Sequence, residues 1–104
     1  MTNLDRRLEL QQLLVDLLGS SYVYFQPPES IKLHYPCIVY ERITGAGQYA
    51  DNKAYMFKIC YRITYIDKDP DNEIIHKLID IPYMSMDRSF KADNLNHDVF
   101  ILYY

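Results

Sequence analysis

The chain has 104 residues, of which 49% are hydrophobic, and this is long enough for one domain with a substantial core, residues 1–104. Its net charge of −3, without a block of Lys and Arg, argues against specific nucleic-acid binding, and no apolar run is long enough to cross a bilayer. Two cysteines are too few for a disulfide framework and the N-terminus lacks a signal-peptide pattern, so we expect a cytosolic product with reduced thiols.

Tyrosine is the unusual part of the composition, because the chain has 11 Tyr and no Trp. A Tyr side chain combines a large apolar ring with a polar hydroxyl, and it is enriched at protein interfaces. Aromatic residues are also frequent in β-sheets. The composition therefore indicates either an interface or a Tyr-rich sheet, and both interpretations stay open at this point.

The first predicted element is a helix over residues 2–18. Thr2 or Asn3 can cap its N-terminus, Asp5 lies in its first turn, and Gly19 stands where a left-handed C-terminal cap belongs. Its apolar arc is wider than one sheet face needs and comprises Leu4, Leu8, Leu10, Leu13, Leu14, Val15, Leu17 and Leu18. We expect either that the helix is wedged between a sheet and loops or that part of the arc contacts another subunit.

A proline-containing, extended connection follows over residues 20–36, with room for a short strand at residues 22–25. Residues 37–44 are rich in β-branched and apolar side chains, and they predict a strand that begins at Cys37. If this strand and the next form a hairpin, Cys37 and Cys60 could come close together. We expect Cys37 to be a buried and inert thiol.

The longest strand pattern covers residues 53–67. Its odd positions are apolar or aromatic and its even positions are mixed, which is the period of a strand with one buried face. A strand of this length spans roughly 45 Å, whereas a domain of this size has a radius of gyration of about 13 Å. We therefore expect a long protruding β-hairpin, in which the Gly-, Asp- and Asn-containing residues 45–52 form the loop.

A second helix is predicted after the acidic residues 67–73. Asp69 is placed to cap it and Pro70 to take its first position, and the helix ends near residue 80. Its inward positions are Ile74, Ile75, Leu78 and Ile79. The alternating Asp residues also resemble the start of a calcium loop, but Asn72 replaces the required Gly and Leu78 the required Glu, so helix capping is the favoured interpretation.

The last third of the chain predicts a strand over residues 83–90, a turn-rich loop over residues 91–97 and a strand over residues 98–104. Both parities of the last strand are apolar, so we expect it to be covered on both faces. The whole pattern predicts an α+β fold in the order α-β-β-α-β-β. Two helices would pack on an antiparallel sheet of about four strands.

No pattern in the sequence makes a positive case for catalysis. His34, His76 and His97 are far apart, and they lack the spacing of a zinc site. His97 beside Asp98 could form an oriented base, but no nucleophile with a known motif accompanies the pair. We expect a protein that is not an enzyme, with no catalytic, cofactor-binding or metal-binding residues and no cofactor.

Three parts of the chain resemble one known family. They are YPCIVYERI (residues 35–43), YADNKAY and YRITYIDKDPDN (residues 49–55 and 61–72), and SFKADNLNHDVF (residues 89–100). Together they resemble the tail-terminator or tail-completion proteins of the neck of long-tailed bacteriophages, from residue 36 to the end. The resemblance implies a helix-on-sheet domain that closes into a hexameric ring, caps the tail tube, ends tail polymerisation and provides the joint to the head.

The resemblance also implies the partners and the location. The partners would be further copies of the chain, the tail-tube protein and a head-completion protein, with no membrane and no specific nucleic acid. The protein would be part of the virion and would assemble in the host cytoplasm. We consider three alternatives: another layer of the head–tail connector, a small ligand-binding or enzymatic α+β domain, and an adaptor that binds peptides at a sheet edge.

The candidate interface with a neighbouring subunit or the tail tube is the loop of the long hairpin. A strand end without a core beneath it needs a partner, the two loop glycines allow close backbone approach, and Tyr49 can serve as an anchor. The predicted interface residues are Gly45, Ala46, Gly47, Gln48, Tyr49, Ala50, Asp51, Asn52 and Tyr55.

Overall fold

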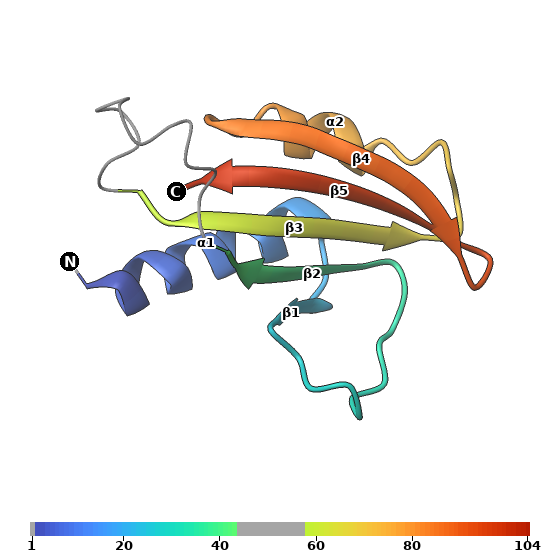
Figure 1. Ribbon diagram of the computed structural model, residues 1–104, viewed down its shortest axis with the longest axis horizontal. Helices are drawn as coiled ribbons and strands as arrows, with labels where there is room; N and C mark the ends of the chain where they lie inside the picture. Colours follow the sequence, from blue (N-terminus) through green and yellow to red (C-terminus); the bar gives the residue numbers. More distant parts are fainter. Residues whose placement is uncertain (1, 44–57) are drawn as a thin grey trace.

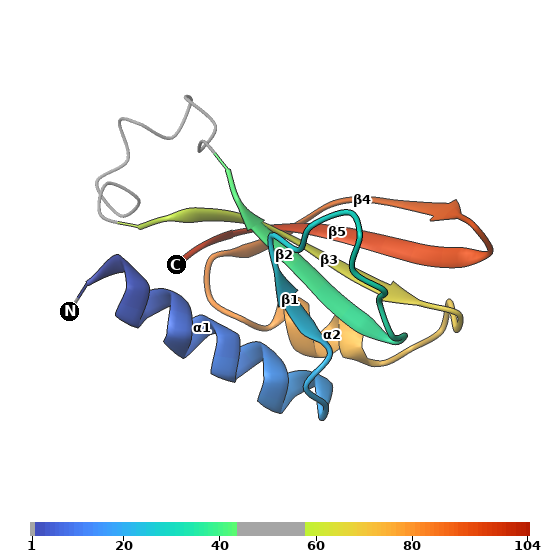
Figure 2. The same ribbon diagram turned by 90° about the horizontal axis from the view of Figure 1, so that it is seen from below.

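A computed structural model describes residues 2–43 and 58–104 and places two helices on one face of a five-stranded sheet (Figures 1 and 2). The elements, in chain order, are α1 (Asn3–Leu18), β1 (Val23–Phe25), β2 (Cys37–Arg42), β3 (Cys60–Asp67), α2 (Ile74–Ile79), β4 (Met84–Ala92) and β5 (Leu95–Tyr103). The strands lie side by side in the order β1-β2-β3-β5-β4. The fold class is α+β, as predicted.

The prediction of about four antiparallel strands is wrong, because the sheet is mixed. The short strand β1 pairs parallel to β2, with Val23 opposite Ile38 and Phe25 opposite Tyr40. The chain leaves β1, runs through residues 26–36 beyond the β1 side of the sheet and enters β2 in the same direction (Figure 1). The other three pairings, β2 with β3, β3 with β5 and β4 with β5, are antiparallel.

Helix α1 begins and ends where its local sequence predicts. The Thr2 hydroxyl accepts a hydrogen bond from the Asp5 backbone N–H at 3.1 Å, and the Asp5 carboxylate accepts one from the Thr2 N–H at 3.1 Å. This capping box lowers the pKa of Asp5 through both bonds to Thr2. Gly19 closes the other end with φ +80°, a conformation that costs glycine little.

The wide apolar arc of α1 is used only in part. Leu10 and Leu14 are completely buried against the sheet, whereas Leu4 and Leu8 are 56% and 51% exposed. The buried side contributes about 1.5–3 kcal/mol for each large apolar side chain removed from water. The α1 flank, by which we mean Leu4 and Leu8, is left outside this core.

The centre of the core is the helix-facing side of β3 and β5. Tyr61, Ile63 and Tyr65 of β3 are buried, as the alternating pattern predicts, and they lie beside Phe100 and Leu102 of β5. Among the described residues, β3 begins at Cys60, so Lys58 and Ile59 of the predicted strand do not belong to it. The chain before it is still attached, since the Tyr104 N–H donates to the Ile59 carbonyl at 2.8 Å. The beginning of the predicted strand, residues 53–57, lies outside the described residues.

The predicted loop over residues 91–97 is also wrong, because β4 and β5 form a tight hairpin. Strand β4 continues to Ala92 and β5 starts at Leu95, so only Asp93 and Asn94 remain for the turn. Both have positive φ, +53° and +63°, which is the conformation of a two-residue turn that matches strand twist. Asp and Asn tolerate this conformation, and their polarity reflects a turn rather than a long loop.

Residues 67–73, which we call the acidic turn, do not begin a helix at Pro70. The Asp67 carboxylate accepts from the Asp69 N–H at 3.1 Å, the Asp69 carboxylate accepts from the Asp71 N–H at 2.9 Å, and the Asn72 side-chain oxygen accepts from the Ile74 N–H at 2.7 Å. The predicted Asp69 cap is therefore wrong, since successive Asp and Asn side chains bond nearby backbone groups and hold a turn instead. Helix α2 starts only at Ile74.

Candidate functional site

The predicted interface residues 45–52 and Tyr55 lie outside the described residues, but both ends of that segment are placed. Arg42 at the end of β2 lies opposite Tyr61 at the start of β3, and the Ile43 N–H donates to the Cys60 carbonyl at 3.0 Å. The two strands are therefore antiparallel neighbours where the segment leaves the sheet, as the hairpin prediction requires.

A cleft of about 330 Å³ lies between the N-terminal half of α1 and this end of the sheet. We call it the cationic cleft, and it is lined by Leu4, Arg7, Phe25, Gln26, Arg42, Ile59 and Tyr61. Its residues come from α1, from the C-terminal ends of β1 and β2 and from the N-terminal end of β3. The sequence analysis missed it, because Arg7 and Arg42 are distant in the chain and neither belongs to a motif.

Arg7 is held in the cleft by an aromatic ring. Its guanidinium carbon lies 4.3 Å from the centroid of the Phe25 ring, within the range of a cation–π interaction. Phe25 is itself fixed against Tyr40 and Tyr61, with ring centroids 5.0 Å and 6.5 Å away. The aromatic residues therefore give the Arg7 charge a defined position.

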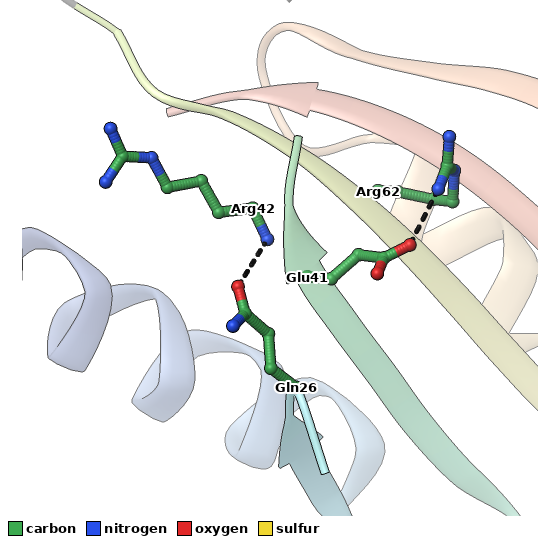
Figure 3. A network of polar contacts seen from close by, with 4 residues as sticks. All are labelled: Gln26, Glu41, Arg42 and Arg62. Atoms are coloured by element: carbon green, nitrogen blue, oxygen red, sulfur yellow. Dashed lines mark hydrogen bonds and ion pairs between the residues drawn. The ribbon is translucent and has the colours of Figure 1, made fainter. Parts of the chain in front are cut away.

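Arg42 carries a second positive charge into the same cleft (Figure 3). Its backbone N–H donates to the Gln26 side-chain oxygen at 3.2 Å, which fixes the strand end, while its side chain extends away from Glu41 and Arg62. Glu41 is paired with Arg62, at 2.6 Å between Oε1 and Nη1. Within residues 2–43 and 58–104, no carboxylate forms an ion pair with Arg42.

Tyr61 lies among the positive charges of the cleft, and they affect the pKa of its hydroxyl. Burial raises the pKa of its hydroxyl, and the positive charges of Arg7, Arg42 and Arg6 act in the opposite direction. Three guanidinium groups are therefore near enough to influence one phenol. A concave surface with this charge attracts anions, and guanidinium groups bind carboxylates in a defined geometry.

A second, smaller cleft of about 300 Å³ lies at the opposite end of the sheet, beside the acidic turn. It is lined by Pro70, Ser89, Phe90, Asn96, His97 and Asp98. His97 stacks on Phe90, with centroids 4.7 Å apart, and its Nδ1 lies 3.1 Å from the Leu95 carbonyl oxygen. Asp98 accepts a hydrogen bond from the Ser89 hydroxyl at 2.6 Å, and among the described residues no hydrogen bond joins Asp98 to His97, as an oriented base would need.

The acidic turn is fixed from beneath by Asp67, which is only 7% exposed. Its carboxylate accepts hydrogen bonds from the Tyr65 hydroxyl and from the Asn72 side-chain amide, the latter at 2.6 Å. The Asn96 amide donates to the Lys68 carbonyl at 3.1 Å, which ties the turn to β5. Burial, followed by the contact with Asp67, raises the pKa of Tyr65.

The two cysteines do not come together as the sequence suggested. Cys37 lies opposite Ile66 and Cys60 lies opposite Tyr103, at opposite ends of β3, because an antiparallel register places the start of β2 against the end of β3. Both are free and buried, and burial followed by the Asp67 charge raises the pKa of Cys37 to about 12. In the described ranges, no three His, Cys, Asp or Glu residues form a group that could hold a metal ion.

The two edges of the sheet differ in their hydrogen bonding. At β1, the Val23 carbonyl accepts from the Gln11 side-chain amide at 3.0 Å, and the Val23 N–H donates to the Ser21 carbonyl at 2.8 Å. At β4, no described strand lies beyond the outer side, and Met86 and Phe90 are 44% and 45% exposed. We call this outer side of Met84–Ala92 the β4 edge.

Neither protein-family models, nor curated proteins, nor solved structures contain a match to this chain. Among the described residues, neither helix combines the length and the apolar character that crossing a bilayer requires. The geometry of the described residues is therefore what bears on function.

Proposed function

We propose that the chain is a structural protein of the virion of a long-tailed bacteriophage, which forms a ring on the tail tube, ends tail polymerisation and joins the tail to the neck. The proposal starts from the sequence stretches that resemble the tail-terminator family. The α+β fold with helices on one face of the sheet agrees with what that resemblance implies. The role is structural rather than catalytic.

The observation that carries the proposal is the open β4 edge. Proteins normally cover or interrupt an edge strand of this length, because its unpaired N–H and C=O groups and exposed apolar side chains attract another chain. Here β4 spans nine residues at the side of the sheet (Figure 1), with a shift of pairing register between Met86 and Arg88, and no described element lies beyond it. A neighbouring subunit that covers it would remove Met86 and Phe90 from water.

The same geometry favours a ring over a two-fold dimer. A second exposed apolar surface, the α1 flank, lies on the side of β1 and not on the side of β4, since Leu4 shares a cleft with Phe25. A contact between two different surfaces of identical subunits is heterologous, and heterologous contacts close into rings when the rotation allows it. The β4 edge against the α1 flank of the next copy is such a contact.

Residues 45–52 and Tyr55 remain the proposed contact with the tail tube or with a neighbouring subunit. The described residues nearest to this segment in the chain include Arg42 and Ile59, and both of these line the cationic cleft. The proposed partners are further copies of the chain, the tail-tube protein of the same phage and a head-completion protein of the neck.

Sedimentation velocity, with and without the tail-tube protein of the same phage, tests this function, with electron microscopy of any oligomer. We expect a closed ring that forms alone or on the end of the tube and stops tube growth. A chain that stays monomeric and leaves tube growth unchanged would contradict the proposal. A ring that does not bind the tail tube but binds head-completion protein would assign the chain to another layer of the neck.

A further inference from the structure

Two surfaces of opposite charge lie far apart on the same molecule. The cationic cleft is at the end of the sheet where β2 stops and where the N-terminus lies, and the acidic turn is beyond the end of β3 (Figure 1). Asp69, Asp71 and Glu73 are exposed in that turn. From Tyr61 in the cleft to Asp67 is six residues of one strand, a distance of roughly 20 Å, so the two surfaces of one copy cannot meet.

We propose that the cationic cleft of one copy receives the acidic turn of a second copy. The inference rests on the proposed function, since it names the charged contact that fixes the register of the head-to-tail ring. The ligand of the cleft is thus the carboxylate groups of Asp71 and Glu73. The partner is the same chain.

The cleft has the donors that this contact needs. Arg7 is fixed on Phe25, and Arg42 extends from a strand end that is anchored to Gln26. Planar guanidinium groups bind carboxylates with two parallel hydrogen bonds, which gives both affinity and orientation. Since the one described ion pair on these strands joins Glu41 to Arg62, Arg42 is available for a carboxylate from outside.

The acidic turn has the rigidity that this contact needs. Three hydrogen bonds from backbone N–H groups to Asp67, Asp69 and Asn72 fix its shape, and Asp67 is buried beneath it. Within the described ranges, no side chain donates to the carboxylates of Asp71 or Glu73. A turn that is already ordered loses little conformational entropy when it binds.

The apolar surroundings of the two surfaces also match. Leu4 of the α1 flank lines the cationic cleft, and Pro70 of the acidic turn shares a cleft with Phe90 of the β4 edge. The charged contact is therefore continuous with the apolar contact proposed between these two surfaces. Charge complementarity then selects one register of two subunits, while apolar burial supplies much of the free energy.

The test compares self-association of the full chain with that of Arg42→Glu, of Asp71→Arg/Glu73→Arg and of the triple variant, by sedimentation velocity with and without tail-tube protein. We expect Arg42→Glu and Asp71→Arg/Glu73→Arg each to weaken self-association by about tenfold or more, and the triple variant to recover part of it. An equimolar mixture of the two weakened variants should also recover part of the association, since copies that alternate in a ring meet through one unchanged and one charge-reversed cleft–turn contact.

Two controls lie at exposed positions of the connection between β1 and β2. Lys32→Glu changes the charge as much as Arg42→Glu, and Glu29→Arg changes it as much as one of the two substitutions in the acidic turn. They should associate like the unchanged chain. Thermal unfolding checks that each variant folds, and if Arg42→Glu does not, Arg42→Gln carries the test with an expected smaller loss.

The outcomes separate this inference from the proposed function. Self-association that survives both sets of substitutions overturns the cleft–turn contact but leaves the ring proposal standing on other surfaces. Charge-dependent association into oligomers that never act on tube protein supports the contact and overturns the function. A chain that stays monomeric with and without tube protein overturns both.

Discussion

The two edges of this sheet are completed in different ways. At β1, a strand of only three residues, the chain uses its own groups, because Gln11 from α1 and Ser21 from the preceding turn bond both polar groups of Val23. At β4, nine residues end the sheet, and no described element lies on their outer side. The comparison shows that the chain bonds polar groups of its own β1 edge, whereas no described element lies beyond β4, where we propose that a second copy binds.

The same division is visible along α1. Leu10 and Leu14 belong to the core, whereas Leu4 and Leu8 of the α1 flank are more than half exposed. Burial of these two side chains against another molecule would be favourable through the hydrophobic effect. Four predictions use this contrast between surfaces completed within the chain and surfaces left open.

The largest loss of stability is expected at the centre of the sheet, and the smaller effects at the two edges are compared with it. Ile63 is completely buried in β3, so Ile63→Ala should lower the free energy of unfolding by about 2–5 kcal/mol. The matched control is Ile59→Ala, since Ile59 is half-buried just before the strand. This substitution should lower the free energy of unfolding clearly less. Denaturant unfolding measures the free energy of unfolding of both variants. Equal losses of this free energy would show that Ile59 belongs to the core as fully as Ile63, contrary to the structure.

The closed edge should show an intermediate effect. In Gln11→Leu, the Val23 carbonyl and the Tyr40 hydroxyl both lose their partner, and we expect a loss of about 1–3 kcal/mol in unfolding free energy. Gln12→Leu is the control, since Gln12 is exposed and bonds only Asp16 on the polar side of the helix. If the two substitutions have the same effect in denaturant unfolding, Gln11 does not close the β1 edge.

The open edge should show the smallest effect on the isolated chain. Met86 is 44% exposed on β4, so Met86→Ala should change the stability of the monomer by no more than about 0.5 kcal/mol while it weakens self-association. Met84, two residues earlier on the same strand, is 9% exposed, and Met84→Ala should cost several times more in thermal unfolding. A large loss of monomer stability in Met86→Ala would mean that this edge is already covered within one copy.

The sequence predicted those parts of the fold that local rules determine. The capping box of Thr2 and Asp5 and the left-handed Gly19 are local, so both ends of α1 could be placed. The buried face of β3 follows from strict alternation, which needs no knowledge of the partner strands.

The errors arose where local signals compete or where the partner is distant. The polar residues around Asp93 and Asn94 have loop composition, yet only these two form the turn, because their positive φ joins two paired strands directly. Asp69 has the composition of a helix cap, yet it bonds the Asp71 N–H instead. Strand β1 is parallel to β2 because residues 26–36 return the chain to the same end of the sheet before β2 begins. These residues have no periodic pattern from which such a connection could be predicted.

The candidate site was the least predictable part, since its residues are brought together only by the fold. Arg7 from a helix and Arg42 from a strand end form one cleft, and neither stands out in the sequence. The predicted loop, residues 45–52, lies outside the described residues. A run of alternating charges or a motif could have marked the cleft, and the sequence contains neither.

The most direct test of the central claim, that another copy covers the β4 edge, is amide hydrogen exchange of the assembled and the dissociated chain, read by mass spectrometry. We predict that peptides covering residues 84–92 exchange more slowly in the assembled state, because outward N–H groups of β4 become buried or paired, while peptides covering residues 63–66 of β3, which is paired on both sides, remain unchanged. Equal exchange of β4 in the two states would contradict the claim.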